Sequence, residues 1–576
     1  MRKSISLICI FCMVLAGLSA SVAAQESISL ASPIYEDMDA LYLISGMGTP
    51  SNARPWTKNE ANLILSRVNR HTLTGVAATV YDNLLKTLGE GLAFQFKDGF
   101  QFGVGMDLNT EGYYHTNSDD FFLEDDWIRG FEDRKPPLRL RFDFSLKDYL
   151  FLYSDLQYGL NRFNYLDTYV SIATQYPNGI GSIIHNAAPF PANLGGYFVT
   201  HSANYSKTFH TNSMPFNKSY DIDFQTPKRA LATVGGDSWN LTLARDKVSW
   251  GNGHSGNFII DDHVDYQEFA RVVAFSDYFK YDWLNVFFET NPTTNEELDN
   301  FFRVLMAHRL EFRIMDKLTF ALSENVMFQN DMFDLRYLNP AFIYHNLNNR
   351  SMFNAIAHVE LDYSFTKGFN AYAQYVLDQA QAPNESAAQA DATGYLAGLE
   401  YAMPAGPGIL TTSLEYAQTS PALYRRDIVD FLMFRKYFTH GAPPGGPGYL
   451  LAIDYIGYKY GGDMQVLQWD AAYRIPEVAE FKLALIGMRH GEVDYFTPND
   501  VVNATRVPTP SGDEVDETLV VSLSGEYKIP KIIRWMEANL YAQMDWIGRR
   551  TLVKATGIYK DKTSDLQLTM GLSISL

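Results

Sequence analysis

From about Leu92 to the end of the chain, hydrophobic and polar residues alternate with a period of two. In the clearest run, at the C-terminus, polar or small residues separate Leu566, Leu568, Met570, Leu572, Ile574 and Leu576. Similar runs cover 138–146, 309–314 and 358–365. Because successive side chains of a strand point to opposite faces, the pattern predicts strands with one apolar and one polar face.

The residues before this region have helical spacing instead. Ile34, Met38 and Leu41 recur at intervals typical of one helix face. Thr57 and Glu60 have the spacing of a capping box, and a further helix is predicted from Thr74 to Leu88. We therefore predict a small helical unit within residues 25–90.

Alternating strands occur both in soluble β-proteins and in outer-membrane barrels. Runs of about 9–11 residues match a tilted membrane crossing, whereas soluble strands average about 5–6 residues. Charged residues inside the runs suit a water-filled lumen, and aromatic residues near their ends suit interfacial girdles. Residues 91–576, at roughly 27 residues per strand and connection, allow about 18 strands. The predicted fold is all-β, a large antiparallel transmembrane β-barrel with a small N-terminal periplasmic helical bundle; a soluble all-β protein is the alternative.

Export is predicted from the first 24 residues. A basic start (Arg2, Lys3), an apolar stretch and small residues before Gln25 are typical of a cleaved signal peptide, here 1–24. Both cysteines, Cys9 and Cys12, lie inside it, so a disulfide framework and a thiolate metal site are excluded. The formal net charge of −19 disfavours nucleic acid as a partner. The predicted location is the outer membrane.

Several short motifs follow one another along the chain. They are Arg54-Pro55, Leu243-Ala244-Arg245-Asp246, Trp250-Gly251-Asn252-Gly253, His308-Arg309-Leu310-Glu311, Glu324, Tyr337-Leu338-Asn339-Pro340, Asn354 and Gly461-Gly462-Asp463. In this order they resemble the Wzi-like capsule assembly family. Ala244 stands where that family commonly has glycine, and Asp261-Asp262-His263 replaces a more apolar segment. These departures bear on ligand contacts more than on the fold.

The resemblance implies an outer-membrane, lectin-like barrel that binds capsular or other surface polysaccharide and helps to retain or assemble it. A porin-type diffusion channel is the alternative, because a barrel of this size can be open or plugged. The expected partners are surface polysaccharide and outer-membrane lipid, and nothing in the sequence demands more than a monomeric barrel.

Six residues are candidate polysaccharide contacts. They are Arg245, Asp246, Trp250, His254, Glu324 and Asn339. A tryptophan can stack on a pyranose face, while arginine and aspartate can hydrogen-bond to hydroxyl groups. In the competing interpretation, Arg245 and Asp246 belong to a luminal ion-pair network and Trp250 packs at a girdle.

Two other polar segments have alternative interpretations. Asp261, Asp262, His263 and Asp265 offer ligands for a cation, but their spacing matches no known metal loop, so a solvated acidic loop is favoured and no metal is predicted. The segment 117–127 is either a glycan-binding external loop or a loop folded onto the barrel.

Enzymatic signals are weak. The sequence Gly253-His254-Ser255-Gly256-Asn257 fails the nucleophile-elbow pattern at its last position. Glu311 and Glu324 could in principle pair as glycosidase carboxylates, but a lumen rich in acids offers many such pairs. We predict no enzymatic activity and no cofactor.

Overall fold

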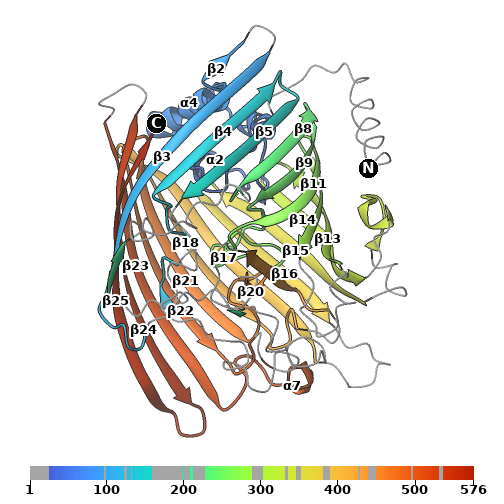
Figure 1. The fold of residues 1–576 in the computed structure, drawn as a ribbon, viewed down its shortest axis with the longest axis vertical. Helices are drawn as coiled ribbons and strands as arrows, with labels where there is room; N and C mark the ends of the chain where they lie inside the picture. Colours follow the sequence, from blue (N-terminus) through green and yellow to red (C-terminus); the bar gives the residue numbers. More distant parts are fainter. Residues whose placement is uncertain are drawn as a thin grey trace.

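Eighteen antiparallel strands close into a barrel in the computed structural model (Figure 1). The structure describes residues 25–96, 99–121, 126–130, 133–158, 197–198, 208–211, 227–288, 302–330, 335–344, 352–379, 390–425, 429–438, 449–494, 497, 499–530 and 536–576. The predicted signal peptide lies outside these residues. No helix among them is long and apolar enough to cross a membrane.

The wall strands neighbour one another in chain order, and the last pairs with the first to close the barrel. They are β3 (Phe100–His115), β4 (Leu138–Leu146), β5 (Leu150–Tyr158), β8 (Ala230–Gly236), β9 (Trp239–Asp246), β11 (Gln267–Phe275), β12 (Phe279–Phe288), β13 (Phe302–Ile314), β14 (Leu318–Asn330), β15 (Met352–Thr366), β16 (Phe369–Gln379), β17 (Ala392–Ala405), β18 (Gly408–Thr419), β21 (Met464–Ile475), β22 (Ala479–His490), β23 (Glu514–Ile529), β24 (Glu537–Val553) and β25 (Ile558–Ser575). Two short strands, β2 (Phe94–Gln95) and β7 (Phe209–Thr211), pair with β3 in addition. The all-β barrel predicted from the sequence is confirmed.

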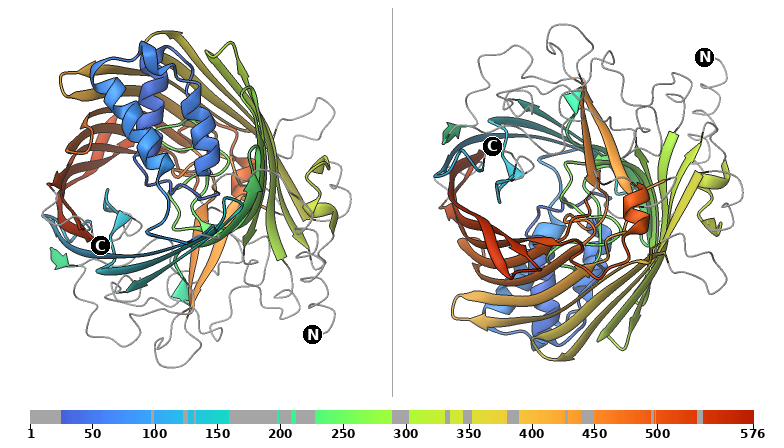
Figure 2. Two further views of the ribbon diagram at one scale, coloured as in Figure 1. Left: turned by 90° about the horizontal axis from the view of Figure 1, so that it is seen from above. Right: turned by 90° about the horizontal axis from the view of Figure 1, so that it is seen from below.

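Three helices cover part of one end of the barrel, the end with the short turns (Figure 2). They are α2 (Ile34–Ser45), α3 (Lys58–Ser66) and α4 (Gly75–Gly89), the last where the sequence predicts a helix. Backbone hydrogen bonds tie this unit to the turns, as from Gly48 N–H to Asp316 O at 3.0 Å. Its apolar core includes Trp56 and extends onto Ala402 and Ile409 of the wall.

The capping box predicted at Thr57 and Glu60 is only half formed. The Thr57 hydroxyl accepts a hydrogen bond from Glu60 N–H at 3.3 Å, as a helix cap should. The Glu60 carboxylate instead binds Lys280 Nζ of β12 at 2.6 Å. A residue expected to serve its own helix therefore anchors the helical unit to the barrel.

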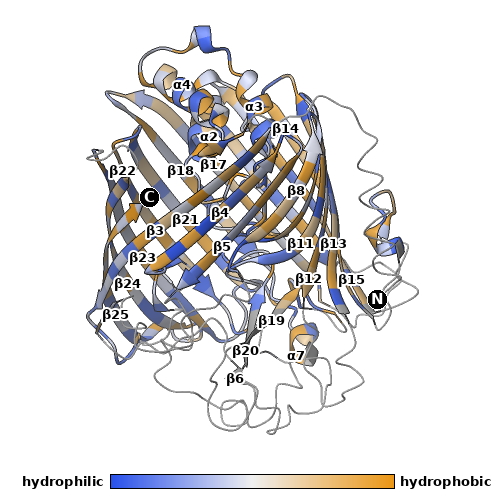
Figure 3. Ribbon diagram, turned by 45° about the horizontal axis from the view of Figure 1, so that its top comes forward, coloured by the Kyte–Doolittle hydropathy of each residue, from blue (hydrophilic) through white to orange (hydrophobic). Residues whose placement is uncertain are grey.

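The two faces of the wall have opposite character, as β25 shows. Leu566 and Met570 point outward and are 40% and 58% exposed, whereas the inward Asp565 and Gln567 are each 1% exposed. Apolar side chains are thus on the outside and polar ones on the inside, the reverse of a soluble protein. Figure 3 shows the same banding of hydrophobic and hydrophilic positions along the wall strands. β25 has 18 residues, well beyond the predicted strand length.

A hydrophobic core fills the middle of the barrel. The strand β10 (Ser249–Trp250) pairs there with β1 (Ala53–Arg54) of the N-terminal unit. The core also contains Phe258 and Ile260 from the loop after β10, together with Leu423 and Tyr458 from the long connection between β18 and β21. We call this cluster the inner core. It includes inward side chains of the wall, and the same connection forms a small sheet of β19 (Leu432–Phe438) and β20 (Tyr449–Tyr455) with β6 (Tyr197–Phe198).

The described residues of the connection between β3 and β4 also fold into the lumen. Its Phe121 is fully buried against Val520 and Ile547, which point inward from β23 and β24. Arg549 of β24 forms an ion pair with Asp126 at 2.5 Å, and its guanidinium lies 4.8 Å from the Phe121 ring. Of the two interpretations of segment 117–127, its described residues match a loop folded onto the barrel.

Candidate functional site

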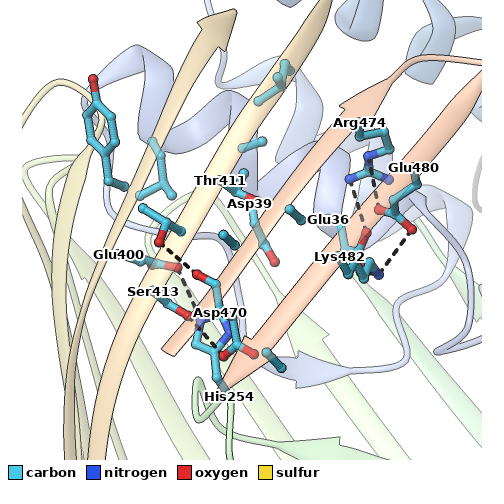
Figure 4. Close-up of a pocket in the computed structure, with 18 of the residues that line it drawn as sticks. Glu36, Asp39, His254, Glu400, Thr411, Ser413, Asp470, Arg474, Glu480 and Lys482 are labelled. Carbon is cyan, nitrogen blue, oxygen red and sulfur yellow. Dashed lines mark hydrogen bonds and ion pairs between the residues drawn. The ribbon is translucent and has the colours of Figure 1, made fainter. Parts of the chain in front are cut away.

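A cavity of about 560 Å³ lies inside the barrel, between α2, the segment 251–254 and the inner wall (Figure 4). Pockets for small molecules commonly have volumes of about 300–1,000 Å³. We call it the lumen chamber. Its polar and charged lining is Glu36, Asp37, Asp39, Thr49, Asn52, Arg54, Asn252, His254, Glu400, Thr411, Thr412, Ser413, Gln468, Asp470, Arg474, Glu480, Lys482, Ser522, Ser524 and Gln543.

His254 enters the chamber from the loop after β10. Gly251 begins this loop with a φ of +137°, and a Cβ there would lie 2.1 Å from Asn257 Oδ1, so the turn requires glycine. The backbone N–H groups of His254 and Ser255 both donate to the Glu415 carboxylate, at 2.8 and 2.9 Å. A buried wall carboxylate therefore fixes the position of the histidine.

The His254 side chain lies among carboxylates. Its Nε2 is 3.5 Å from Glu400 Oε2, and 38% of the side chain remains exposed, in a position that lines the chamber. Burial opposes its protonation, but the hydrogen bond and charge of Glu400, with the charges of Glu415 and Asp470, outweigh burial and raise its pKa to about 9. At neutral pH the imidazole therefore carries a positive charge.

A second cluster of charged side chains lines the chamber near the β21–β22 turn. Arg474 and Lys482 of the wall contact Glu36 of α2 at 3.3 and 2.8 Å. Burial opposes ionisation of Glu36, but Lys482 and Arg474 prevail and lower its pKa to about 2. The neighbouring Asp37 is 3.3 Å from Arg474, yet burial dominates and raises its pKa to about 6. This network joins α2 to β21 and β22.

Besides Arg474 and Lys482, Arg54 is the remaining Lys or Arg side chain that lines the chamber, and its charge is also neutralised. Two hydrogen bonds of 2.7 and 2.8 Å join it to Asp39, and its guanidinium lies 4.8 Å from the Tyr35 ring. Six carboxylates line the chamber against three Lys and Arg side chains and His254. Its interior therefore carries a net negative charge and many hydrogen-bond acceptors. The described residues include no group of three or more His, Cys, Asp or Glu placed to hold a metal ion.

Of the six predicted contact residues, only His254 lines the chamber. Asp246 points into the barrel but forms two hydrogen bonds of 2.6 Å with Arg229. Arg245, one residue earlier, points outward, where its Nε donates to Glu268 at 2.9 Å and its guanidinium stacks on Tyr266. Only Asp246 thus joins a luminal ion pair, because adjacent strand residues face opposite sides.

The expectation for Trp250 was wrong in both of its forms. Its side chain is fully buried in the inner core, where β10 pairs with β1. It therefore offers no face to a sugar and does not lie at a membrane girdle. Trp239 of β9, which is 38% exposed on the outer face, is a tryptophan in such a position.

Glu324 and Asn339 lie outside the barrel. Residues 335–344 pack against the outer face of the wall, and Figures 1 and 2 show this segment beside the barrel. We call it the outer-wall strap. Asn339 Oδ1 accepts a hydrogen bond from Ala341 N–H at 3.0 Å within the strap. Glu324 therefore cannot pair with the inward Glu311, which excludes the carboxylate pair considered from the sequence.

The outer-wall strap covers polar side chains that would otherwise face lipid. Glu324 Oε2 is 2.8 Å from His308 Nε2, and the Tyr344 ring stacks on His308 with centroids 5.2 Å apart. The Tyr344 backbone N–H donates to Glu324 at 3.2 Å, while its hydroxyl accepts from Trp283 Nε1 at 2.5 Å. The polar side chains of His308, Glu324 and Trp283 thus have protein partners in place of lipid.

The acidic segment near His254 is mostly buried, contrary to the expected solvated loop. His263 lies between Asp261 and Asp454, with both carboxylates 3.2 Å from its ring nitrogens. Burial opposes its charge, but Asp454 and Asp261 outweigh burial and raise its pKa to about 10. Of the acids, Asp261 and Asp265 are buried and only Asp262 is exposed. The segment is a packing element of the inner core.

Sequence reasoning missed the wall carboxylates that surround His254, namely Glu400, Glu415 and Asp470. Each alternates with outward residues, as Glu400 does between Leu399 and Tyr401, so the period of two marks it as inward. The pattern does not show which inward residues meet, because that depends on how β17, β18 and β21 pair.

Comparison with known proteins supports the fold. No protein-family model and no curated protein sequence matches the chain. Wzi of Escherichia coli, described as a carbohydrate-binding β-barrel involved in group 1 capsule assembly, is 11% identical with a TM-score of 0.54, covering 96% of this chain and 99% of Wzi.

Two other outer-membrane proteins superpose less well. OprD of Pseudomonas aeruginosa is 8% identical with a TM-score of 0.36, and the match covers 84% of this chain and 96% of OprD. OmpT of Vibrio cholerae is 10% identical with a TM-score of 0.33, and the match covers 84% of this chain and 100% of OmpT. The chain therefore has a Wzi-like fold.

Proposed function

We propose that this protein is an outer-membrane barrel that binds a capsular or other surface polysaccharide and holds it at the cell surface without chemical change. The inner core is the observation that carries this proposal. A diffusion channel needs a continuous polar path, whereas here Trp250, Phe258 and Tyr458 pack together across the middle of the barrel. A filled barrel suits binding better than transport.

The membrane placement follows from the surface of the wall. Outward apolar residues such as Leu566 and Met570 would contact lipid, and the short turns of such barrels face the periplasm. The helical unit would then be periplasmic and the long connections external. A closed wall leaves no unpaired sheet edge, so the barrel can exist as a monomer.

The proposal is tested by comparing cell-bound with released polysaccharide in wild-type and gene-deleted cells. We expect intact polysaccharide to move from the cells to the medium after deletion. Expression of the wild-type gene should reverse the shift, and expression of Met570→Leu, a conservative change on the outer face, should do so equally. An unchanged distribution in the deletion strain would contradict surface retention.

The channel alternative requires a separate measurement. Purified protein in a planar bilayer should give no stable open steps, because the inner core and the β3–β4 connection occupy the lumen. Regular conductance steps of the unmodified protein would favour a diffusion channel instead.

A further inference from the structure

We propose that the lumen chamber binds a sugar unit carrying a free amino group. That the ligand is a saccharide rests on the proposed function. That it carries an amino group is inferred from the residues that line the chamber. No residue of the outer-wall strap lines the chamber, and of the long connections only the segment 251–254, between β9 and β11, reaches it. It extends from Pro476, at the short β21–β22 turn, to His254 near the inner core.

Small side chains keep the chamber open. The wall opposite α2 contributes Ala472, Ala484, Ser522 and Ser524, from three neighbouring strands. Protein interiors are otherwise closely packed, with few voids larger than a water molecule. A space of about 560 Å³ between a helix and a closed wall is therefore available to a small ligand.

The cations of the chamber are already engaged. Arg54 binds Asp39 through two hydrogen bonds, while Arg474 and Lys482 contact Glu36. The fourth cation, His254, lies 3.5 Å from the Glu400 carboxylate. A ligand carboxylate would have to displace one of these partners. Acidic sugars are therefore disfavoured by charge.

Two side chains at the His254 end of the chamber have oxygen atoms that can accept further hydrogen bonds. Asp470 accepts hydrogen bonds from Gln468 at 2.9 Å and Ser413 at 3.4 Å, but no Lys or Arg among the described residues lies within ion-pair distance of it. Gln468 is 7% exposed, and its Oε1 has no hydrogen-bond partner within the described part of the chain. An amide oxygen without a donor, beside a carboxylate without a Lys or Arg partner, calls for a donor-rich ligand group.

An ammonium group meets this requirement, since it supplies three N–H donors and a positive charge. The hydroxyl groups of Thr411 and Ser413 and the amides of Asn52 and Asn252 line the same space and can bind sugar hydroxyls. The chamber therefore selects for an amino group beside several hydroxyl groups, which is the pattern of an amino sugar.

The test uses the full-length protein in detergent and three probes: a glucosamine dimer, its N-acetylated form and a galacturonate dimer. Isothermal titration calorimetry should show binding of the glucosamine dimer only. We expect Asp470→Asn to weaken it about tenfold, since a charge-assisted hydrogen bond contributes about 1.5–3 kcal/mol and 1.4 kcal/mol is a factor of about ten. Ala484→Leu should weaken it by filling the chamber.

The matched control is Glu477→Gln, which removes the same charge from the turn that follows β21. Glu477 lies in the β21–β22 turn with a side chain 70% exposed and does not line the chamber. It should bind the glucosamine dimer like the unmodified protein. Three results would overturn the proposal. They are equal affinity for the glucosamine and N-acetylated dimers, a loss of affinity in Glu477→Gln equal to that in Asp470→Asn, and no binding of the glucosamine dimer.

The two proposals fail in different experiments. If deletion of the gene releases polysaccharide but the purified protein binds no glucosamine dimer, the chamber assignment is wrong and surface retention stands. If the dimer binds and Asp470→Asn weakens it, but deletion leaves the polysaccharide on the cells, the chamber stands and surface retention is wrong.

Discussion

His254 carries a charge because of the carboxylates around it. Its pKa of about 9 lies above the ordinary value of 6.5. A histidine with a raised pKa stabilises the fold fully below pH 6.5, and this contribution is lost as the pH rises through about 9. We expect its imidazole NMR signal to titrate near 9 and Glu400→Gln to move the midpoint towards 6.5. Glu477→Gln should leave the midpoint in place, and an unmoved midpoint in Glu400→Gln would exclude Glu400 as the cause.

Trp250 should matter for stability rather than for ligand contact. Truncating a fully buried tryptophan removes apolar contacts and leaves a cavity, so Trp250→Ala should lower the free energy of unfolding by about 3–5 kcal/mol. Trp239→Ala, on the outer face, should cost clearly less. Urea unfolding of the vesicle-inserted protein measures both, and equal losses would show that Trp250 is not a core residue.

At this scale, the alternation could assign a face to each strand residue but not its neighbours. Arg245 and Asp246 are adjacent on β9, so the period of two already separates them. Their partners Glu268 and Arg229 lie on β11 and just before β8, and only strand pairing brings them near. Loop residues have no such period, and His254 could not be placed by the pattern.

The outer-wall strap is an element that periodicity did not reveal. It should shield Trp283, which is 4% exposed beneath Tyr344. In a variant that keeps Trp283 as its single tryptophan, brominated lipid should hardly quench the fluorescence. A variant keeping only Trp546, 39% exposed on the same outer surface, should be strongly quenched.

Removing the cover should change this result. Adding Tyr344→Ala to the Trp283-only variant should expose the indole and raise its quenching towards the level of Trp546, since the ring over His308 is lost. Tyr344→Phe keeps the ring and should preserve most of the shielding. Strong quenching of Trp283 in the unmodified strap would mean that the segment does not cover the wall in a membrane.

The wall strands were predictable as elements because each carries its own signal, an apolar outer face and a polar inner face. The helices of residues 34–89 were also predictable from their own sequence. The inner core was not, because it joins segments far apart in sequence, as in the hydrogen bond from Asp261 N–H to Ile456 O at 3.1 Å. Each loop carries apolar residues such as Phe258 and Ile456, but no local pattern shows which of them meet.

For the whole molecule, the assignment of the two ends of the barrel can be tested with cysteines. Residues 25–576 contain none, so each introduced thiol would be the only one in a chain from which the predicted signal peptide has been removed. Val478 is 44% exposed in a short turn beside the helical unit, and Ala555 is exposed in the turn between β24 and β25 at the opposite end. If the end with the helical unit faces the periplasm, the two positions lie on opposite sides of the outer membrane.

Intact cells treated with a maleimide on a polymer too large for outer-membrane pores should therefore label Ala555→Cys and not Val478→Cys. Permeabilising the outer membrane should make Val478→Cys reactive, and the unmodified protein should stay unlabelled throughout. Labelling of Val478→Cys alone in intact cells would reverse the orientation of the barrel and place the Pro476 end of the lumen chamber at the cell surface. Labelling of neither position, even after permeabilisation, would contradict the exposure of both turns. The expected pattern places the Pro476 end of the lumen chamber on the periplasmic side.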